Sequence, residues 1–132
     1  MWIHTDTAFV SIVAHRDRPG DLLVRARTRR DIEAFGVPES EITVDTDADY
    51  LWRATMPRSW VAEQMMTFVE RIDYGNVKQA VSTRVGDQRA RTLMKVWGDL
   101  LEIEAEDPAR CRAHLLSGPT LTPLGVTHTN WA

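Results

Sequence analysis

The feature that most constrains the fold is a pair of alternating segments near the N-terminus, residues 9–16 (FVSIVAHR) and 22–28 (LLVRART). Apolar residues fill every second position of each segment and β-branched residues are frequent, a pattern typical of half-buried strands. Between the segments lies Pro19-Gly20, which favours a tight turn because proline fixes φ and glycine tolerates positive φ. The sequence therefore predicts a β-hairpin.

The alternation divides the side chains of this hairpin between two faces. Apolar side chains make up the face that we expect to lie on the core: Val10, Ile12, Ala14, Leu22, Val24 and Ala26. The opposite face brings together His15, Arg25 and Arg27 among apolar neighbours. The hairpin is thus expected to present a basic, partly apolar surface.

A short helix and two further strands are expected after the hairpin. Thr28 fits the N-cap of the helix, and Gly36 followed by Pro38 fits its end. Residues 41–45 (EITVD) are a weak strand candidate, and residues 50–56 (YLWRATM) are a stronger one.

Two long amphipathic patterns follow. The first opens at Pro57 and carries an apolar stripe of Val61, Met65, Phe68, Val69 and Ile72. Residues 73–76 (DYGN) interrupt it before the helical pattern resumes. The second runs over residues 87–104, with Asp87 as its expected N-cap. Its apolar positions are Leu93, Val96, Trp97, Leu100 and Leu101.

This order of elements predicts an α+β protein, a sandwich of the ferredoxin-like type with the N-terminal hairpin in a three- to four-stranded sheet backed by helices. A right-handed crossover after the second strand would place the third strand beside the first. We expect residues 1–106 to form one domain. Residues 107–132 hold three prolines and no periodic pattern, and are expected to form an extended or flexible tail.

The charges are unevenly distributed along the chain. The net charge is −3, yet residues 15–30 contain six arginines and two aspartates, whereas residues 39–49 contain five acids and no base. Bulk affinity for nucleic acid is therefore not expected, although a local basic surface is. The single cysteine, Cys111, excludes an internal disulfide framework. No segment reads as a membrane span or a signal peptide, so a cytoplasmic location is expected.

Several phrases resemble a known group of sequences: MWI, TD, FVS and HRD within residues 1–17, LLVRAR at 22–27, ADY at 48–50 and IDYGNVK at 72–78. Trp97 also fits. On these residues the chain resembles a family of small proteins from actinobacteria, related bacteria and their phages, over residues 1–103. The resemblance implies a shared fold and an origin in a phage or prophage. The family has no established activity that could be transferred.

The basic hairpin face is the first candidate site. His15, Arg25 and Arg27 would be joined by Arg53 if the strand over residues 50–56 exposes it on the same side. Guanidinium groups and an aromatic side chain on an open sheet can stack the bases of single-stranded nucleic acid. Alternatively, these arginines pair with neighbouring acids, including those of residues 39–49, on a solvated face, where such pairs contribute little.

Other polar clusters favour structural interpretations. The two His-x-Asp pairs, at residues 4–6 and 15–17, are too far apart in an extended strand to share one metal ion. Cys111 is flanked by Arg110 and Arg112, which would favour its thiolate, but its segment lacks the rigidity that catalysis needs. Residues 73–76 suit a turn better than a polar site. We expect no metal, no cofactor and no catalytic residues.

Apolar residues outside the core provide candidate partner surfaces. Met66 lies off the main helical stripe, and Leu121, Leu124 and Trp131 in the tail could dock on a groove. The sequence is therefore interpreted as a small, non-enzymatic cytoplasmic interaction protein that acts through a protein partner or self-association. The alternative is binding of single-stranded nucleic acid or another anion through the basic sheet face.

Overall fold

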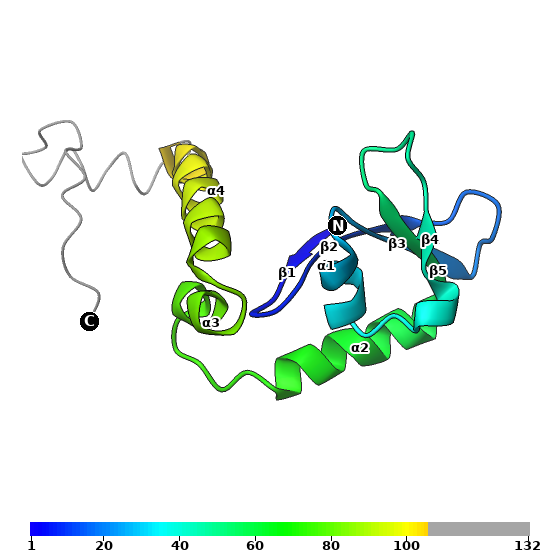
Figure 1. Ribbon diagram of the computed structural model, residues 1–132, viewed down its shortest axis with the longest axis horizontal. Helices are drawn as coiled ribbons and strands as arrows, with labels where there is room; N and C mark the ends of the chain where they lie inside the picture. The colour runs from blue at the N-terminus through cyan, green and yellow to red at the C-terminus, as the bar shows by residue number, and fades with distance from the viewer. Residues whose placement is uncertain (106–132) are drawn as a thin grey trace, which may run out of the picture. The chain divides into compact units, whose positions relative to one another are not determined.

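Five strands form one antiparallel sheet in a computed structural model that describes residues 1–105 (Figure 1). The spatial order is β1-β2-β3-β5-β4. The strands are β1 Trp2–His4, β2 Phe9–Ala14, β3 Asp21–Ala26, β4 Thr43–Val44 and β5 Trp52–Pro57. The α+β class and the N-terminal hairpin are confirmed, and the sheet has one strand more than the largest number expected.

The chain divides into two compact units, Met1–Leu93 and Met94–Ala132, and the sheet belongs to the first. The helices are α1 Arg29–Ala34, α2 Arg58–Glu70, α3 Val77–Arg84 and α4 Asp87–Ala105, with a 3₁₀ turn at Glu39–Glu41. The α4 helix runs from the first unit into the second. Across residues 1–105, no helix combines the length and the apolar character that a bilayer span requires.

The hairpin register explains why one face of the sheet is buried. Ile12 of β2 lies opposite Val24 of β3, which in turn lies opposite Ala54 of β5. On this face α1 contributes Ile32 to a shared core, its C-cap residue Phe35 also belongs to it, and α2 contributes Val61. The sheet members of the core are Ile3, Val10, Ile12, Leu22, Val24, Ala26, Ala54 and Met56. Ala14, expected on this face, is exposed because β2 ends there.

The position of β5 differs from the expected crossover. It pairs antiparallel with β3, with Leu22 opposite Met56, and does not lie beside β2. Ala26 at the end of β3 lies opposite Trp52 at the start of β5. The chain therefore re-enters the sheet from the end at which β3 left it, and the new pairing is antiparallel.

The sheet gains a strand that the periodicity did not indicate. β1 pairs antiparallel with β2, with Trp2 opposite Ser11 and Ile3 opposite Val10. Three residues are too few to show an alternation, since a turn of polar residues follows at once. The weak strand expected over residues 41–45 shortens to the two residues of β4.

The first helix is bounded as its sequence predicts. Thr28 is the N-cap of α1, and its hydroxyl oxygen accepts a hydrogen bond from the Asp31 backbone N–H. At the other end Gly36 has φ +97°, and the Val37 N–H donates to the Ile32 carbonyl. This is the arrangement of a Schellman motif, which needs a left-handed residue that glycine supplies without strain.

The α2 helix buries fewer of its apolar residues than its stripe suggests. Val61 is buried, and Met65 and Phe68 pack partly against the core. Val69 and Ile72, expected on the buried side, are 63% and 55% exposed. Phe68 is the last residue of the stripe that packs against the core, and Ile72 lies beyond the end of α2 at Glu70. Met66, expected off the stripe, is exposed.

Polar residues mark the beginnings of the last two helices. Asn76 is the N-cap of α3, and its side-chain oxygen accepts from the backbone N–H groups of Lys78 and Gln79. The interruption at residues 73–76 is therefore a helix break, as expected. Asp87 lies within the first turn of α4 and not at the cap, where its carboxylate still complements the helix dipole.

Candidate functional site

The face of the sheet opposite the core carries a transverse row of side chains, one from each strand. The register aligns them in the order Trp2, Ser11, Arg25, Arg53 and Thr43. His4 and Phe9 form a second pair beside this row. We call this surface the sheet face. Of the residues that the sequence singled out, Arg25 and Arg53 are direct cross-strand neighbours.

Arg25 is held in place by its own neighbours. Its Nη2 donates to the Ser11 hydroxyl oxygen at 2.8 Å, and its Cζ lies 4.8 Å from the ring centroid of Tyr50. Its Nε is buried without a hydrogen-bond partner among the described residues. The aromatic ring compensates part of that deficit, since its negative face attracts the guanidinium.

Arg27 lies just beyond the end of β3 and contacts the same ring. Its Cζ is also 4.8 Å from the Tyr50 centroid, and its Nη1 donates to the Asp49 carbonyl at 3.2 Å. Tyr50 itself is only 4% exposed. The two guanidinium groups therefore anchor the segment before β5 to the end of β3.

Arg53 is paired with acids from the preceding loop. Its guanidinium lies 3.3 Å from the Asp45 carboxylate and 3.8 Å from the Asp49 carboxylate. Its Nε also donates to the Tyr50 carbonyl at 3.1 Å. Both acids belong to residues 39–49, so Arg53 follows the alternative interpretation of the charge pattern, in which arginines are neutralised by this acidic segment.

His15 lies apart from the arginines. β2 ends at Ala14, and the Nδ1 of His15 accepts a hydrogen bond from the Asp17 backbone N–H within the turn. Arg25 is opposite Ser11, four residues back along the strand, or about 13 Å. The structure thus brings Arg25, Arg27 and Arg53 together around Tyr50 and does not bring His15 to them.

The β1 end of the sheet face is aromatic. The Trp2 and Phe9 rings meet edge to face at 6.0 Å, and the His4 and Phe9 rings are 5.7 Å apart. Trp2 is 70% exposed. Burial lowers the pKa of His4, the positive charge of Arg89 lowers it further, and Asp31 opposes both. The place of Trp2 and His4 on the sheet face was missed from the sequence because β1 was missed. With only three residues in β1, no periodic signal could have indicated it.

A buried carboxylate of α1 lies at the end of the sheet, close to the first turn of α4. Asp31, 1% exposed, accepts hydrogen bonds from the Phe9 backbone N–H at 3.0 Å, the Thr28 hydroxyl at 2.5 Å and the Arg89 guanidinium at 2.7 Å. Phe9 lies two residues beyond Ser11, where β3 has already ended. The carboxylate therefore accepts the hydrogen bond of the Phe9 backbone N–H that a neighbouring strand would otherwise accept. Its role is structural.

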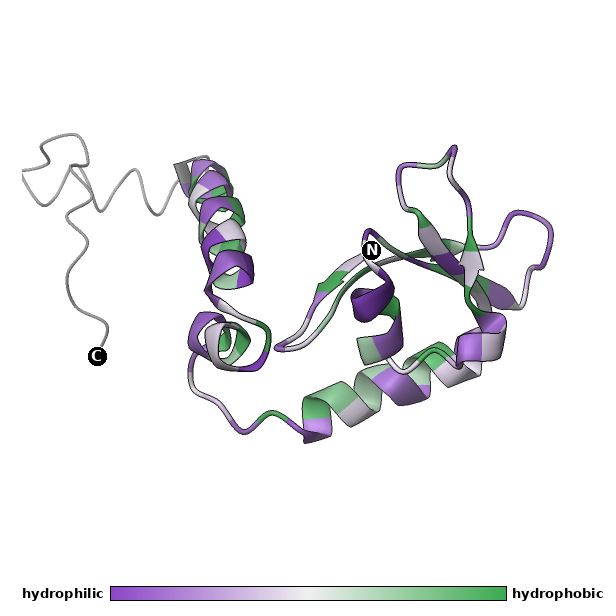
Figure 2. Cartoon of the chain, viewed as in Figure 1, coloured by the Kyte–Doolittle hydropathy of each residue, from purple (hydrophilic) through white to green (hydrophobic). Residues whose placement is uncertain are grey.

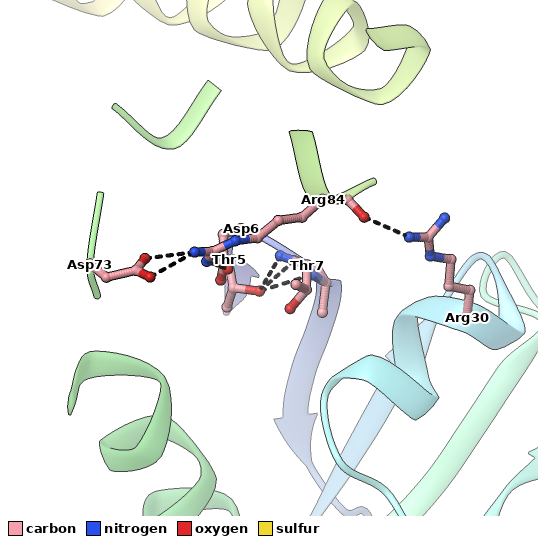
Figure 3. A network of polar contacts seen from close by, with 7 residues as sticks. Thr5, Asp6, Thr7, Arg30, Asp73 and Arg84 are labelled. Carbon is pink, nitrogen blue, oxygen red and sulfur yellow. Dashed lines mark hydrogen bonds and ion pairs between the residues drawn. The ribbon is translucent and has the colours of Figure 1, made fainter. Parts of the chain in front are cut away.

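A second polar network surrounds Arg84 (Figure 3). Its Nη2 donates to both oxygens of the Asp73 carboxylate at 2.7 and 2.9 Å, and its Nη1 donates to Asp6. Its carbonyl oxygen accepts from Arg30 at 3.1 Å, and its Cζ lies 5.7 Å from the Tyr74 ring centroid. The Arg84 guanidinium lowers the pKa of Asp73, and the carboxylates of Asp73 and Asp6 raise the pKa of Arg84.

An open pocket of about 260 Å³ lies beside this network, between the helix break and α3. Its lining includes Tyr74, Asn76 and Thr83, together with the ion pair of Asp73 and Arg84. The cationic and anionic groups satisfy each other, and the Asn76 oxygen caps α3. The pocket therefore offers no charged group without a partner to a ligand.

The remaining polar candidates do not form a cluster of metal ligands within residues 1–105. No group of three or more His, Cys, Asp or Glu side chains there is placed to hold a metal ion. The His-x-Asp pairs lie at opposite ends of β2, where Asp6 pairs with Arg84 and His15 caps the turn. Cys111, Leu121, Leu124 and Trp131 lie outside the described residues.

Apolar side chains are exposed at helical spacing on two helices. On α4, Val96, Leu100 and Ile103 are 45%, 53% and 62% exposed, and Figure 2 shows apolar and polar residues interleaved around this helix. Together with the half-buried Leu93 they are called the α4 stripe below. On and after α2, Met66, 58% exposed, lies at the same spacing from Val69 and Ile72, and these three are called the α2 patch.

Comparisons with known proteins found no similar protein. No family model matches the chain, and no curated protein or solved structure matches it.

Proposed function

We propose that this chain is a non-enzymatic interaction protein of the cytoplasm that works by associating with protein through apolar helix surface. The observation that carries the proposal is the exposure of the α4 stripe, whose large aliphatic side chains recur on one side of a helix. Contiguous exposed apolar surface is characteristic of protein–protein contact sites. An origin in a phage or prophage, implied by the family resemblance, stays a prediction.

The chemistry of the polar clusters supports the same conclusion. The two strongest, around Asp31 and around Arg84, are closed sets of ion pairs and hydrogen bonds within the first unit. Catalysis needs a nucleophile, a base and an orienting group that converge on space for a substrate. Neither cluster has that arrangement. Their hydrogen bonds instead join the helices to the sheet turns.

Cross-linking in a lysate of the source cells tests this function. The wild-type chain should give protein adducts that the Leu100→Glu/Ile103→Glu variant loses, since both side chains are exposed and their replacement leaves the core intact. Gln88→Glu, an exposed change elsewhere on α4, is the matched control and should keep the adducts. Adducts that persist unchanged in the stripe variant would contradict the proposal.

A second candidate function is supported by one specific observation, the row of Trp2, Ser11, Arg25 and Arg53 across the sheet face. An exposed tryptophan beside guanidinium groups on a sheet suits base stacking and phosphate contact with single-stranded nucleic acid. The candidate ranks second because Arg53 is already paired with two acids and Arg25 and Arg27 are engaged at Tyr50.

Fluorescence anisotropy with labelled oligonucleotides at about 50 and 200 mM salt tests this second candidate. Binding through the sheet face should weaken with salt, and the Arg25→Ala/Arg27→Ala variant should flatten the salt slope. Trp2→Ala should weaken binding to single strands more than to duplexes, because only unpaired bases stack on it. Arg18→Ala, in the exposed β2–β3 turn, is the matched control. Absence of binding at micromolar protein would eliminate the candidate.

A further inference from the structure

We propose that the edge strand β1 pairs antiparallel with β1 of a second copy of this chain, about a two-fold axis at Ile3, so that the two sheets become continuous. This edge shares no residue with the α4 stripe on which the proposed function rests, so the two surfaces can be tested separately. Three features of β1 support the pairing: its outward backbone groups, the symmetry of its side chains and its lack of charge.

The outer edge of β1 presents backbone hydrogen-bonding groups. β1 is the last strand at one side of the sheet and pairs only with β2 (Figure 1). The Met1 carbonyl accepts a hydrogen bond of 2.8 Å from β2, and the Thr5 N–H donates one of 2.9 Å to the turn that leads into β2. Inward and outward groups alternate along an antiparallel strand. Ile3 therefore also faces β2, and the N–H and C=O groups of Trp2 and His4 point outward.

These outward groups define the kind of partner. No group within residues 1–105 forms a hydrogen bond with the outward N–H and C=O of Trp2 or His4. The two residues repeat the same donor and acceptor about 7 Å apart along the strand. Only extended backbone offers matching groups at that spacing, so the edge is a template for another strand.

The symmetry of the edge indicates that this strand is β1 of a second copy. An axis at Ile3 places Trp2 of each copy opposite His4 of the other, and each of these pairs exchanges both backbone hydrogen bonds. No other axis pairs the two outward residues with each other. An axis at His4, for example, would set Trp2 opposite Asp6, which lies in the turn after β1.

The side chains of β1 are compatible with this register. On the sheet face, Trp2, which is 70% exposed, would lie opposite the His4 ring of the second copy, and aromatic cross-strand pairs are favourable. On the other face the two Ile3 side chains would meet and extend the core. Burial and the positive charge of Arg89 lower the pKa of His4, so its ring is neutral at neutral pH. The pairing therefore brings no like charges of β1 together.

The opposite edge of the sheet lacks these properties. β4 has only two residues, Thr43–Val44, and Glu41, Asp45 and Asp47 lie close to it in the chain. Two copies paired through β4 would bring these carboxylates together, and like charges are a common protection of sheet edges. β1 contains no charged residue and no proline. Of the two edges, β1 is therefore the one suited to pairing between copies.

Sedimentation velocity of the full chain over roughly 10–500 µM tests the pairing, because a contact of a few residues a side is small and predicts a transient dimer. The mass should rise from 15.0 kDa towards twice that value. His4→Pro should abolish the rise, since proline removes the outward N–H of an edge strand and leaves the inward hydrogen bonds to β2 intact.

Two control variants should keep the rise in mass. His4→Val also removes the imidazole ring but retains the backbone N–H. Val44→Pro removes an outward N–H from the opposite edge, because the neighbouring Asp45 N–H is directed to the Leu51 carbonyl. Circular dichroism verifies that all three variants remain folded.

Cysteine variants test the register and do not depend on the folding of His4→Pro. In a Cys111→Ser background, Ile3→Cys should form a disulfide between copies, because directly opposite residues of this kind have Cα atoms about 4.5 Å apart. His4→Cys should not, because the two His4 positions are offset by two residues, beyond the Cα separation of about 7 Å that a disulfide spans. A disulfide formed by His4→Cys in preference to Ile3→Cys would overturn the proposal.

A wild-type chain that stays monomeric over the whole concentration range would also overturn it, as would a dimer that persists in a folded His4→Pro variant. The Leu100→Glu/Ile103→Glu variant should keep the β1 dimer. If that variant loses protein adducts in a lysate but still dimerises, both proposals are supported. If the wild type gives such adducts and does not dimerise, only the pairing of β1 is wrong.

Discussion

Arg89, in the first turn of α4, donates a hydrogen bond of 2.7 Å to the Oδ2 of Asp31, a carboxylate that the helix α1 holds almost entirely buried. The same carboxylate accepts from the Phe9 backbone N–H, so one side chain connects β2, α1 and α4. All of these residues belong to the first compact unit. The ion pair thus fastens the beginning of α4 to the end of the sheet.

Replacement of the Arg89 side chain should lower the free energy of unfolding. In Arg89→Ala the buried carboxylate of Asp31 loses its counter-charge, and we expect a loss of about 2–3 kcal/mol in the free energy of unfolding. Urea denaturation followed by circular dichroism measures it. Arg18→Ala removes an exposed pair 3.9 Å from Asp21 and should change stability by less than about 0.5 kcal/mol. Equal losses in the two variants would show that the burial of Asp31 is unimportant.

Stability should fall as the pH drops below neutrality because of His4. Its pKa in the folded protein is lowered from 6.5, chiefly by burial. As the pH falls through 6.5 the unfolded chain binds the proton before the folded chain does, so the contribution of His4 is present above 6.5 and is lost towards its lower folded-state pKa. Urea midpoints between about pH 7.5 and 5.5 should decline less in His4→Gln than in the wild type. Parallel curves would refute this assignment.

Two glycines should respond to alanine in opposite ways. At Gly36, with φ +97°, a Cβ would lie 2.7 Å from the Gln64 Oε1, and we expect Gly36→Ala to destabilise the protein by about 1–2 kcal/mol. Gly98 lies within α4, and a Cβ there meets nothing within 4 Å. Gly98→Ala should stabilise the helix by about 0.5–1 kcal/mol. Amide hydrogen exchange across α4 measures the stabilisation of the helix by Gly98→Ala. Denaturation of the sheet would not report a local change in the stability of α4.

The ring of Tyr50 should matter more than its hydroxyl group. Tyr50→Phe keeps the surface beneath Arg25 and Arg27, and we expect a change of less than about 0.5 kcal/mol. Tyr50→Leu removes both cation–π contacts, and its loss should exceed that of Tyr50→Phe by about 1–2 kcal/mol. Thermal denaturation of the two variants side by side provides the comparison. Equal stability would mean that the guanidinium contacts contribute nothing.

Local sequence patterns were sufficient to predict the elements whose alternation or capping residues lie within the element itself. Strict alternation predicts β2 and β3, Thr28 and Gly36 predict both ends of α1, and Asn76 marks the break before α3. Each depends on residues close in sequence, namely a two-residue period, a cap or a left-handed glycine. The alternation left open whether Arg53 shares the face of Arg25, and the register makes the two residues cross-strand neighbours.

The sequence by itself thus determined the α+β class, the hairpin and the face that each strand presents, because these follow from backbone periodicity. The partners of each charge were decided only by the tertiary structure. The acids that neutralise Arg53, the ring beneath Arg25 and the burial of Asp31 against Arg89 all depend on segments that meet after folding. The position of β5 was decided in the same way, because its pairing with β3 joins segments that are distant in sequence.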